Sequence, residues 1–318
     1  MTHHFAIRPR PPFRLDLTVW ALRRRPHNAI DRYSDGLYRR ALVFDGRALA
    51  VSVCQSGPGR SSELQVKIDL PGQARRHARG ERLAEIFVRG ALERLLGLRC
   101  DLSGFMRMAR PDPLLGPLAL RLQGLKPPRF PTVFEALVNG IACQQLSLQV
   151  GIHLLDRLTA AYGPALPGDP ERLHAFPGPE LLAEARPTRL RELGFSAAKA
   201  GALRGAAAAI ARGSLDLEGL ASEERAAAME RLMALSGVGR WTAEYVMLRG
   251  LGRIDTFPVD DVGARNTLAR VLRSKQRLDA AAAADVVARW RPYAGMAYFH
   301  LLLDSLAEAG LVDLQGTR

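Results

Sequence analysis

The chain has 318 residues, 47% of them hydrophobic, which is enough to fill the cores of two globular domains and excludes a disordered chain. Its net charge of +13 favours a polyanionic partner, although arginine and alanine richness set by genome base composition accounts for part of that charge. No secretory segment and no membrane-length apolar run is visible, so we expect a soluble cytoplasmic protein without a membrane contact.

The first part of the chain predicts a small antiparallel sheet covered by a helix. Asp45 and Gly46 suit a tight turn between two strands. Alternating or β-branched runs typical of strands occupy residues 38–44, 47–55 and 64–70. Residues 82–98 have helical apolar spacing, and the side chains available to cover the sheet are Ile86, Leu92, Leu95 and Leu96.

A proline-rich joint, GLKPPRFP, separates this part from a chain that is helical in pattern to its end. We place the domain boundary near Lys126. The predicted fold class is α+β, with an N-terminal sheet-and-helix domain over residues 1–126 and an all-helical domain over residues 127–318. The arginine run at 23–25 is interpreted as a solvated patch.

The helical part contains a long apolar-periodic stretch over residues 132–163, broken near Gln144 to Ser147. Further on, residues 226–235 and 241–251 predict two helices joined by the turn Ser236-Gly237-Val238-Gly239. Two glycines at alternate positions let backbone N–H groups approach an anion, and the second helix begins there with the positive end of its dipole. A hairpin over about 235–242 would therefore hold a phosphate, whereas the plain alternative is a glycine C-cap between two helices.

An acidic pair, Asp260 and Asp261, follows the second helix and precedes residues 262–272, which predict a further helix. A carboxylate at that helix N-terminus would be held in its ionised form by the dipole. Either aspartate could equally serve as the N-cap of the helix.

The motifs GVGRWTAEY and FPVDD resemble those of the helix-hairpin-helix DNA glycosylases, and within them the AlkA type that repairs alkylated DNA. Ser236 stands where that family often has proline. Glycosylases of the superfamily that also cut the backbone have a lysine near the position of Trp241, and an indole cannot form a Schiff base. The resemblance therefore implies a monofunctional enzyme that hydrolyses the N-glycosidic bond of an alkylated purine such as 3-methyladenine or 7-methylguanine.

The resemblance also implies roles for particular residues. Asp261 becomes the candidate catalytic acid, with Asp260 as the second choice. Trp241 and Tyr245 would line the base pocket, and Leu302 falls where the family often has an indole, a loss for which Tyr293, Tyr298 or Phe299 could compensate. Leu146 would wedge into the gap left by the extracted base. The residues implied in DNA binding are Gln145, Leu146, Ser236, Gly237, Gly239 and Thr242.

The implied partner is double-stranded DNA containing damaged bases, bound by a monomer. The alternatives are a non-catalytic DNA-binding protein with the same hairpin and a glycosylase for oxidised or deaminated bases. No organic cofactor is expected, and Cys54, Cys100 and Cys143 are too far apart to hold an iron–sulfur cluster. A monovalent or divalent cation at the hairpin carbonyls is compatible with the resemblance.

Overall fold

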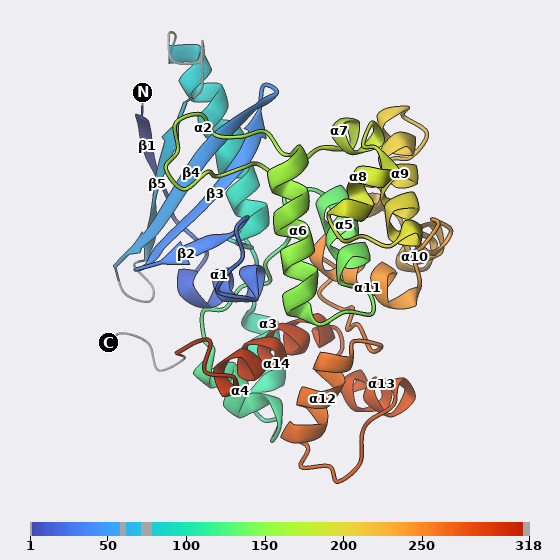
Figure 1. The fold of residues 1–318 in the computed structure, drawn as a ribbon. Helices are drawn as coiled ribbons and strands as arrows, with labels where there is room; N and C mark the ends of the chain where they lie inside the picture. Colours follow the sequence, from blue (N-terminus) through green and yellow to red (C-terminus); the bar gives the residue numbers. More distant parts are fainter. Residues whose placement is uncertain (1, 58–61, 71–77, 314–318) are drawn as a thin grey trace.

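The computed structural model describes residues 2–57, 62–70 and 78–313. Its N-terminal part is a five-stranded antiparallel sheet with the order β1-β5-β4-β3-β2 (Figure 1). The strands are β1 (Thr2–Ile7), β2 (Arg32–Ser34), β3 (Leu37–Phe44), β4 (Arg47–Ser56) and β5 (Glu63–Asp69). The predicted turn is present between β3 and β4, where Asp45 and Gly46 have φ angles of 50° and 69°.

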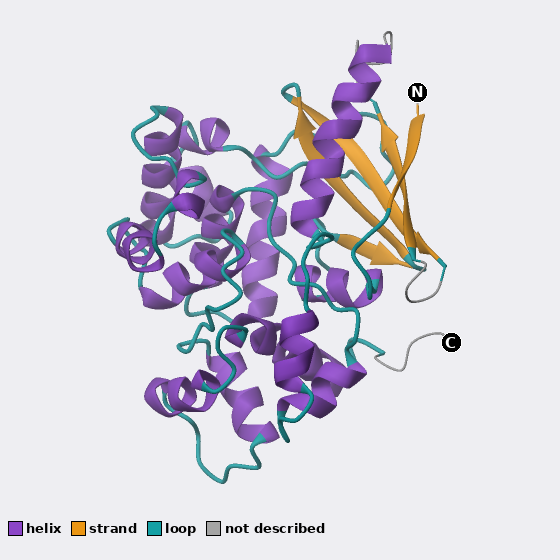
Figure 2. Ribbon diagram, turned by 180° about the vertical axis from the view of Figure 1, so that it is seen from behind, coloured by secondary structure: helices purple, strands orange, loops and turns teal. Residues whose placement is uncertain are grey.

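Helix α2 (Ala78–Leu95) lies along one face of this sheet (Figure 2). Leu92, Leu95 and Leu96 are buried in the common core, as predicted. Ile86 is 59% exposed, so its prediction as a sheet-covering residue is wrong. At 100° per residue, position 86 points away from the stripe that Ala84, Val88 and Leu92 form.

The rest of the chain is helical, as predicted (Figure 1). A short helix α1 (Leu15–Arg23) follows β1, and the later elements are α3 (Ser103–Ala109), α4 (Leu115–Arg121), α5 (Val133–Cys143), α6 (Leu148–Tyr162), α7 (Pro179–Ala183), α8 (Pro187–Glu192), α9 (Ala197–Ala211), η3 (Gly219–Ser222), α10 (Arg225–Met233), α11 (Arg240–Arg249), α12 (Val262–Val271), α13 (Ala280–Ala288) and α14 (Ala294–Glu308). The predicted break in residues 132–163 is the loop between α5 and α6, where Ser147 caps α6 by accepting a hydrogen bond from Val150 N–H.

Two large apolar clusters account for most of the core of the described residues, and a third, small one is formed by Ala41, Ala48, Leu173 and Ala175. The first large cluster joins the sheet and α2 to α5, α6, α9 and α11, and the second joins α3 and α4 to α12, α13 and α14. Leu118 and Leu122 thus belong to the same cluster as Leu268 and Phe299, which lie far beyond Lys126 in the chain. The boundary near Lys126 remains a prediction, and the packing on either side of it is continuous.

The arginine run at 23–25 is not the solvated patch that we predicted. Arg23 and Arg24 are each 4% exposed. The Arg24 backbone adopts the left-handed conformation, with φ 63°, at the end of α1, and its guanidinium turns inward toward α5 and α11. Among the described residues, no helix is long and apolar enough to cross a membrane.

Candidate active site

The hairpin between α10 and α11 has the geometry that its glycines predict. Gly237 has φ 76°, and a Cβ there would lie 2.7 Å from the Ala202 side chain, so both its conformation and its surroundings require glycine. Gly239 forms the N-cap of α11 without a side chain over the helix end. Ser236, Gly237 and Gly239 are exposed, which leaves the N–H groups of the first turn of α11 accessible to an anion.

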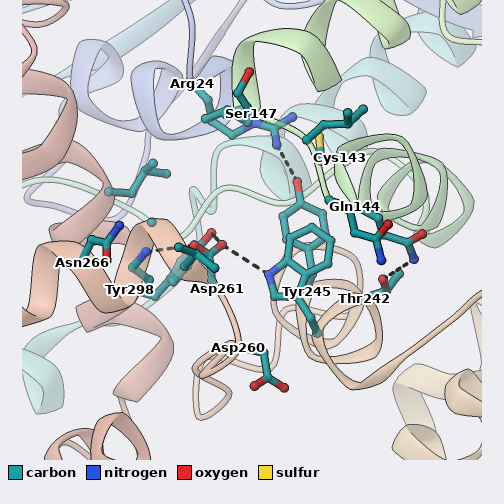
Figure 3. Close-up of a pocket in the computed structure, with 18 of the residues that line it drawn as sticks. Arg24, Cys143, Gln144, Ser147, Thr242, Tyr245, Asp260, Asp261, Asn266 and Tyr298 are labelled. Carbon is teal, nitrogen blue, oxygen red and sulfur yellow. Dashed lines mark hydrogen bonds between the residues drawn. The ribbon is translucent and has the colours of Figure 1, made fainter. Parts of the chain in front are cut away.

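A cavity of about 1000 Å³ opens beside this hairpin. Its walls come from the end of α1, the α5–α6 loop, α11, the start of α12 and α14 (Figure 3). Most residues predicted for the site line it, namely Gln145, Leu146, Gly237, Gly239, Trp241, Thr242, Tyr245, Asp260, Asp261 and Leu302. Segments separated by more than a hundred residues in the chain therefore meet at one site.

Asp261 both caps α12 and lines the cavity, which are the two roles that the sequence left open for it. Its Oδ1 accepts a hydrogen bond from Ala264 N–H at 2.9 Å, which caps α12. Its Oδ2 faces the cavity, where the Tyr298 hydroxyl donates to it at 3.0 Å and Trp241 Nε1 donates at 3.4 Å. Capping fixes the carboxylate while one oxygen remains directed at the space where a ligand would lie.

Asp260 also lines the cavity but belongs to a different environment. In Figure 3 its carboxylate points away from the cluster around Asp261. Glu244 on α11 holds the segment that precedes Asp260, because its Oε2 accepts a hydrogen bond from Val259 N–H. The other oxygen, Oε1, accepts a hydrogen bond from Arg240 Nε. The arrangement favours Asp261 over Asp260 as the group that meets a ligand.

Trp241 and Tyr245 form an aromatic wall opposite Asp261. Their rings are stacked, with centroids 5.4 Å apart and an interplanar angle of 30°. Burial raises the pKa of the Tyr245 hydroxyl, which accepts a hydrogen bond from Arg24 Nη1 at 2.9 Å. The second Arg24 nitrogen, Nη2, donates to Asn139 at 2.7 Å, so a cation from the N-terminal part of the chain lies at the foot of the wall.

Tyr298 takes the place that we predicted for Tyr293. Burial, reinforced by the Asp261 carboxylate, raises the pKa of Tyr298 well above its usual value, so its hydroxyl stays protonated and donates to Asp261. Tyr293 precedes α14 and faces α3, where its ring packs edge-on against Phe105. The prediction of Tyr293 as a pocket residue is wrong because it lies more than one helical turn from Tyr298 and on another side of α14.

The loop between α5 and α6 projects two side chains at the mouth of the cavity. Leu146 is 42% exposed, an unusual position for a large apolar side chain, and its role as a wedge between bases stays a prediction. Gln145 is also exposed and has a left-handed backbone with φ 54°. Leu302 lies half-buried in the opposite wall on α14, and its part in a base pocket stays a prediction.

One residue implied in DNA binding lies differently from our expectation. Thr242 is 1% exposed as a whole residue, and its hydroxyl accepts a hydrogen bond from Gln144 Nε2, so its side chain is held inside the protein. Ser236 is exposed on the hairpin, where its role in DNA binding stays a prediction. The side chain of Thr242 is turned inward because it follows the N-cap by one helical turn and packs on α5.

Sequence reasoning missed Arg24, Gln144 and Asn266, all of which line or support the cavity. The signal for Arg24 was its place in LRRRP, directly after a short apolar helix whose end turns the chain inward. Nothing in the local sequence indicates that this arginine lies next to Tyr245, 221 positions away.

A hairpin between two helices, beside a cavity with a capped carboxylate and an aromatic wall, defines a helix-hairpin-helix protein. The family model of the HhH-GPD superfamily base excision DNA repair proteins matches residues 138–314. The match covers more than half of the chain, which therefore belongs to that superfamily.

Relatives agree with this assignment. The chain is 33% identical over 177 residues to a Bacillus subtilis protein named DNA-3-methyladenine glycosylase, covering 56% of this chain and 58% of the relative. It is 28% identical over 297 residues to DNA-3-methyladenine glycosylase 2 of Escherichia coli, covering 92% of this chain and 94% of that protein. The structure of a 3-methyladenine DNA glycosylase from Archaeoglobus fulgidus superposes with a TM-score of 0.80 at 26% identity, covering 97% of this chain and 100% of the other. The α+β fold is thus shared along nearly the full chain, although the chain spans little more than half the length of the Bacillus relative.

Metal and cofactor sites are a separate question. Within the described ranges, no group of at least three histidine, cysteine or acidic side chains is placed to hold a metal ion. The three cysteines are free thiols, with Cys54 exposed, Cys100 partly buried and Cys143 buried. The expected absence of an organic cofactor remains a prediction. So does the binding of a cation at the hairpin. The Gly237 carbonyl, one of the oxygens such a cation would use, accepts a hydrogen bond from Gln144.

Proposed function

We propose that the protein is a monofunctional DNA glycosylase that extracts an alkylated purine from duplex DNA and hydrolyses its N-glycosidic bond. The observation that carries this proposal is the Asp261 carboxylate, held by α12 and directed at a cavity walled by Trp241 and Tyr245. The names of the Bacillus and Escherichia relatives support the same activity and the same class of substrate. The protein is proposed to act as a monomer on double-stranded DNA.

The reaction requires a negative charge close to the deoxyribose, and the Asp261 carboxylate can supply it. As the bond between deoxyribose C1′ and the base breaks, its electron pair leaves with the base and positive charge grows on the sugar. Asp261 Oδ2 is placed to stabilise that charge and to orient the water whose oxygen attacks C1′. The water proton passes to the carboxylate or to solvent, and an abasic sugar remains.

The aromatic wall accounts for the choice of an alkylated purine. Such a base is already cationic, so it becomes neutral on leaving and needs no strong acid to protonate it. Trp241 is partly exposed and can present the negative face of its π system to a cation, while Tyr245, 2% exposed, stacks behind it. An extracted base would also regain on the Trp241 indole part of the stacking that it lost in the duplex.

A lyase reaction needs a free amine in the cavity. Among the described residues, the cavity lining contains no lysine. The amine of Lys199, on α9, donates to the carbonyl oxygens of Ala142 and Gln144 and is thereby occupied. These contacts support hydrolysis by water over attack by an amine.

The proposal is tested by incubating methylated duplex DNA with the protein and separating the released bases by chromatography. Release of 3-methyladenine or 7-methylguanine by the wild type and its loss in Asp261→Asn supports the activity and the role of the acid. Tight DNA binding without base release would overturn the proposal in favour of a DNA-binding protein. Covalent trapping of the protein on DNA by borohydride would overturn the monofunctional assignment.

A further inference from the structure

We infer that Gln144 is a positioning residue, which fastens the loop carrying Leu146 to the phosphate-binding hairpin. The inference rests on the proposed function, because it concerns the step in which the base leaves the duplex. The Gln144 side chain is not placed to touch the reacting atoms, since its amide is directed at the hairpin and at α11 (Figure 3).

The loop between α5 and α6 is short and its backbone is held in an unfavourable conformation. Gln144 ends α5 with φ −55° and ψ 133°, and Gln145 then adopts φ 54°. A left-handed conformation outside glycine costs about 1 kcal/mol or more and persists only where surrounding contacts impose it. Leu146, the next residue, gains its exposed position from this reversal of the chain.

The Gln144 amide supplies the contacts on one side of the loop. Its Nε2 donates to the Gly237 carbonyl oxygen in the hairpin and to Thr242 Oγ1 on α11, each at 2.8 Å. Both N–H bonds of one amide group are thereby used, and each partner belongs to the hairpin or to the helix that begins there. The Gln144 side chain therefore lies between the start of α11, where a phosphate would bind, and the loop that carries Leu146.

Lys199 supplies contacts on the other side. Its ammonium group donates to the Ala142 carbonyl at 3.0 Å and to the Gln144 carbonyl at 2.8 Å, which satisfies the end of α5. Burial lowers the pKa of Lys199, as expected for an amine packed beneath a loop. The backbone of Gln144 is thus held from α9 while its side chain is held from the hairpin.

These contacts make the hairpin and the Leu146 loop one unit. When the hairpin binds the DNA backbone, the Gln144 amide fixes where Leu146 enters the base stack. Loss of the amide should leave phosphate binding intact, because the N–H groups of α11 do not depend on it, and should weaken base extraction. Gln144 therefore acts on the flipping equilibrium, which a residue that merely stabilises the fold would not do selectively.

The test uses Gln144→Ala and Gln144→Glu, with the exposed Gln123→Ala as the matched control. Duplex DNA carries 2-aminopurine beside a methylated purine, so that fluorescence reports unstacking, anisotropy reports binding, and chromatography reports base release. We expect DNA affinity to change by no more than about threefold, while flipping amplitude and single-turnover release each fall by about tenfold or more. The control should match the wild type in all measurements.

Unchanged flipping in the folded Gln144 variants would overturn the inference, and so would an equal loss of affinity and flipping. Thr242→Val removes one of the two acceptors and provides a second test if Gln144→Ala does not fold. We expect Thr242→Val alone to weaken flipping. Where Gln144→Ala does fold, Thr242→Val should add nothing to it in the double variant, and additive losses would contradict a shared contact. If the wild type flips the reporter but releases no base, the proposed function is refuted. The fluorescence of the Gln144 variants still confirms or refutes the role of Gln144 in flipping.

Discussion

Replacing Asp261 by asparagine removes the cavity carboxylate with the smallest change of shape. Asparagine is as good an N-cap as aspartate, so the bond to Ala264 N–H can be kept. The bonds at Oδ2 are less well kept, because the new NH₂ group meets the Trp241 N–H, which is also a donor. We expect the free energy of unfolding to fall by about 1–2 kcal/mol, the value of a weakened hydrogen bond or two.

The effect on catalysis should be much larger than the effect on stability. A preorganised charge beside the developing cation is worth about 10²–10³-fold in rate, and removing one is expected to lower single-turnover base release by at least that factor. DNA affinity should change little, because the hairpin N–H groups lie apart from Asp261. The losses in rate and stability are measured by base release on methylated duplex DNA and by urea unfolding.

Asp260→Asn is the matched control, since it removes the neighbouring charge without touching the bonds of Asp261. It should retain base release within about threefold of the wild type, as expected for a group outside the reacting centre. Wild-type release by Asp261→Asn, or a large loss in Asp260→Asn alone, would refute the reasoning and exchange the roles of the two aspartates.

Three further predictions concern packing and charge. Leu146→Ala should leave the free energy of unfolding within about 0.5 kcal/mol, because the side chain is 42% exposed, yet reduce base flipping measured with 2-aminopurine. Burial raises the pKa of Asp156 from 3.8 to about 6, so the folded state retains its proton while the unfolded state loses it between those values. Asp156→Asn should therefore stabilise the protein by about 1–3 kcal/mol above pH 7 and by little below pH 4, as measured by urea titration at both pH values. Arg40, 1% exposed, binds Glu135 on α5 and also Asp31. Because Asp31 still pairs with Arg40 in Glu135→Ala, that variant should lose about 1.5–3 kcal/mol in the free energy of unfolding, measured by urea unfolding; no measurable loss would show that water replaces the pair.

The sequence predicts the fold wherever a segment shows its own periodicity. The β3–β4 hairpin and the α5–α6 break are present because alternation, turn residues and helix caps are all local signals. Strands β1 and β2 escaped prediction for different reasons. The sequence THHFAI of β1 shows little apolar alternation, and β2 contains only three residues, so their pairing with neighbouring strands defines them.

The candidate site divides in the same way. The hairpin and Asp261 are visible in the sequence because a turn, a helix start and an acid lie within one short segment. The partners of these groups are not visible, because the Arg24–Tyr245 bond joins residues 221 positions apart and the Gln144–Thr242 bond joins residues 98 positions apart. No local pattern encodes such contacts, since they exist only once the helices have packed.

The packing that creates these contacts can be traced to one glycine on α5. A Cβ at Gly140 would lie 2.9 Å from the Thr242 methyl group and 3.5 Å from the Tyr245 ring, so glycine allows α5 and α11 to approach closely. Gln144 follows Gly140 by about one helical turn, and it reaches Thr242 and the Gly237 carbonyl only at that separation. A larger residue at position 140 would move the end of α5, and the Leu146 loop with it, away from the hairpin. The distance between the phosphate-binding hairpin and the Leu146 loop is therefore set by the packing of α5 on α11. Gly140, which allows that packing, lies outside the hairpin and FPVDD motifs.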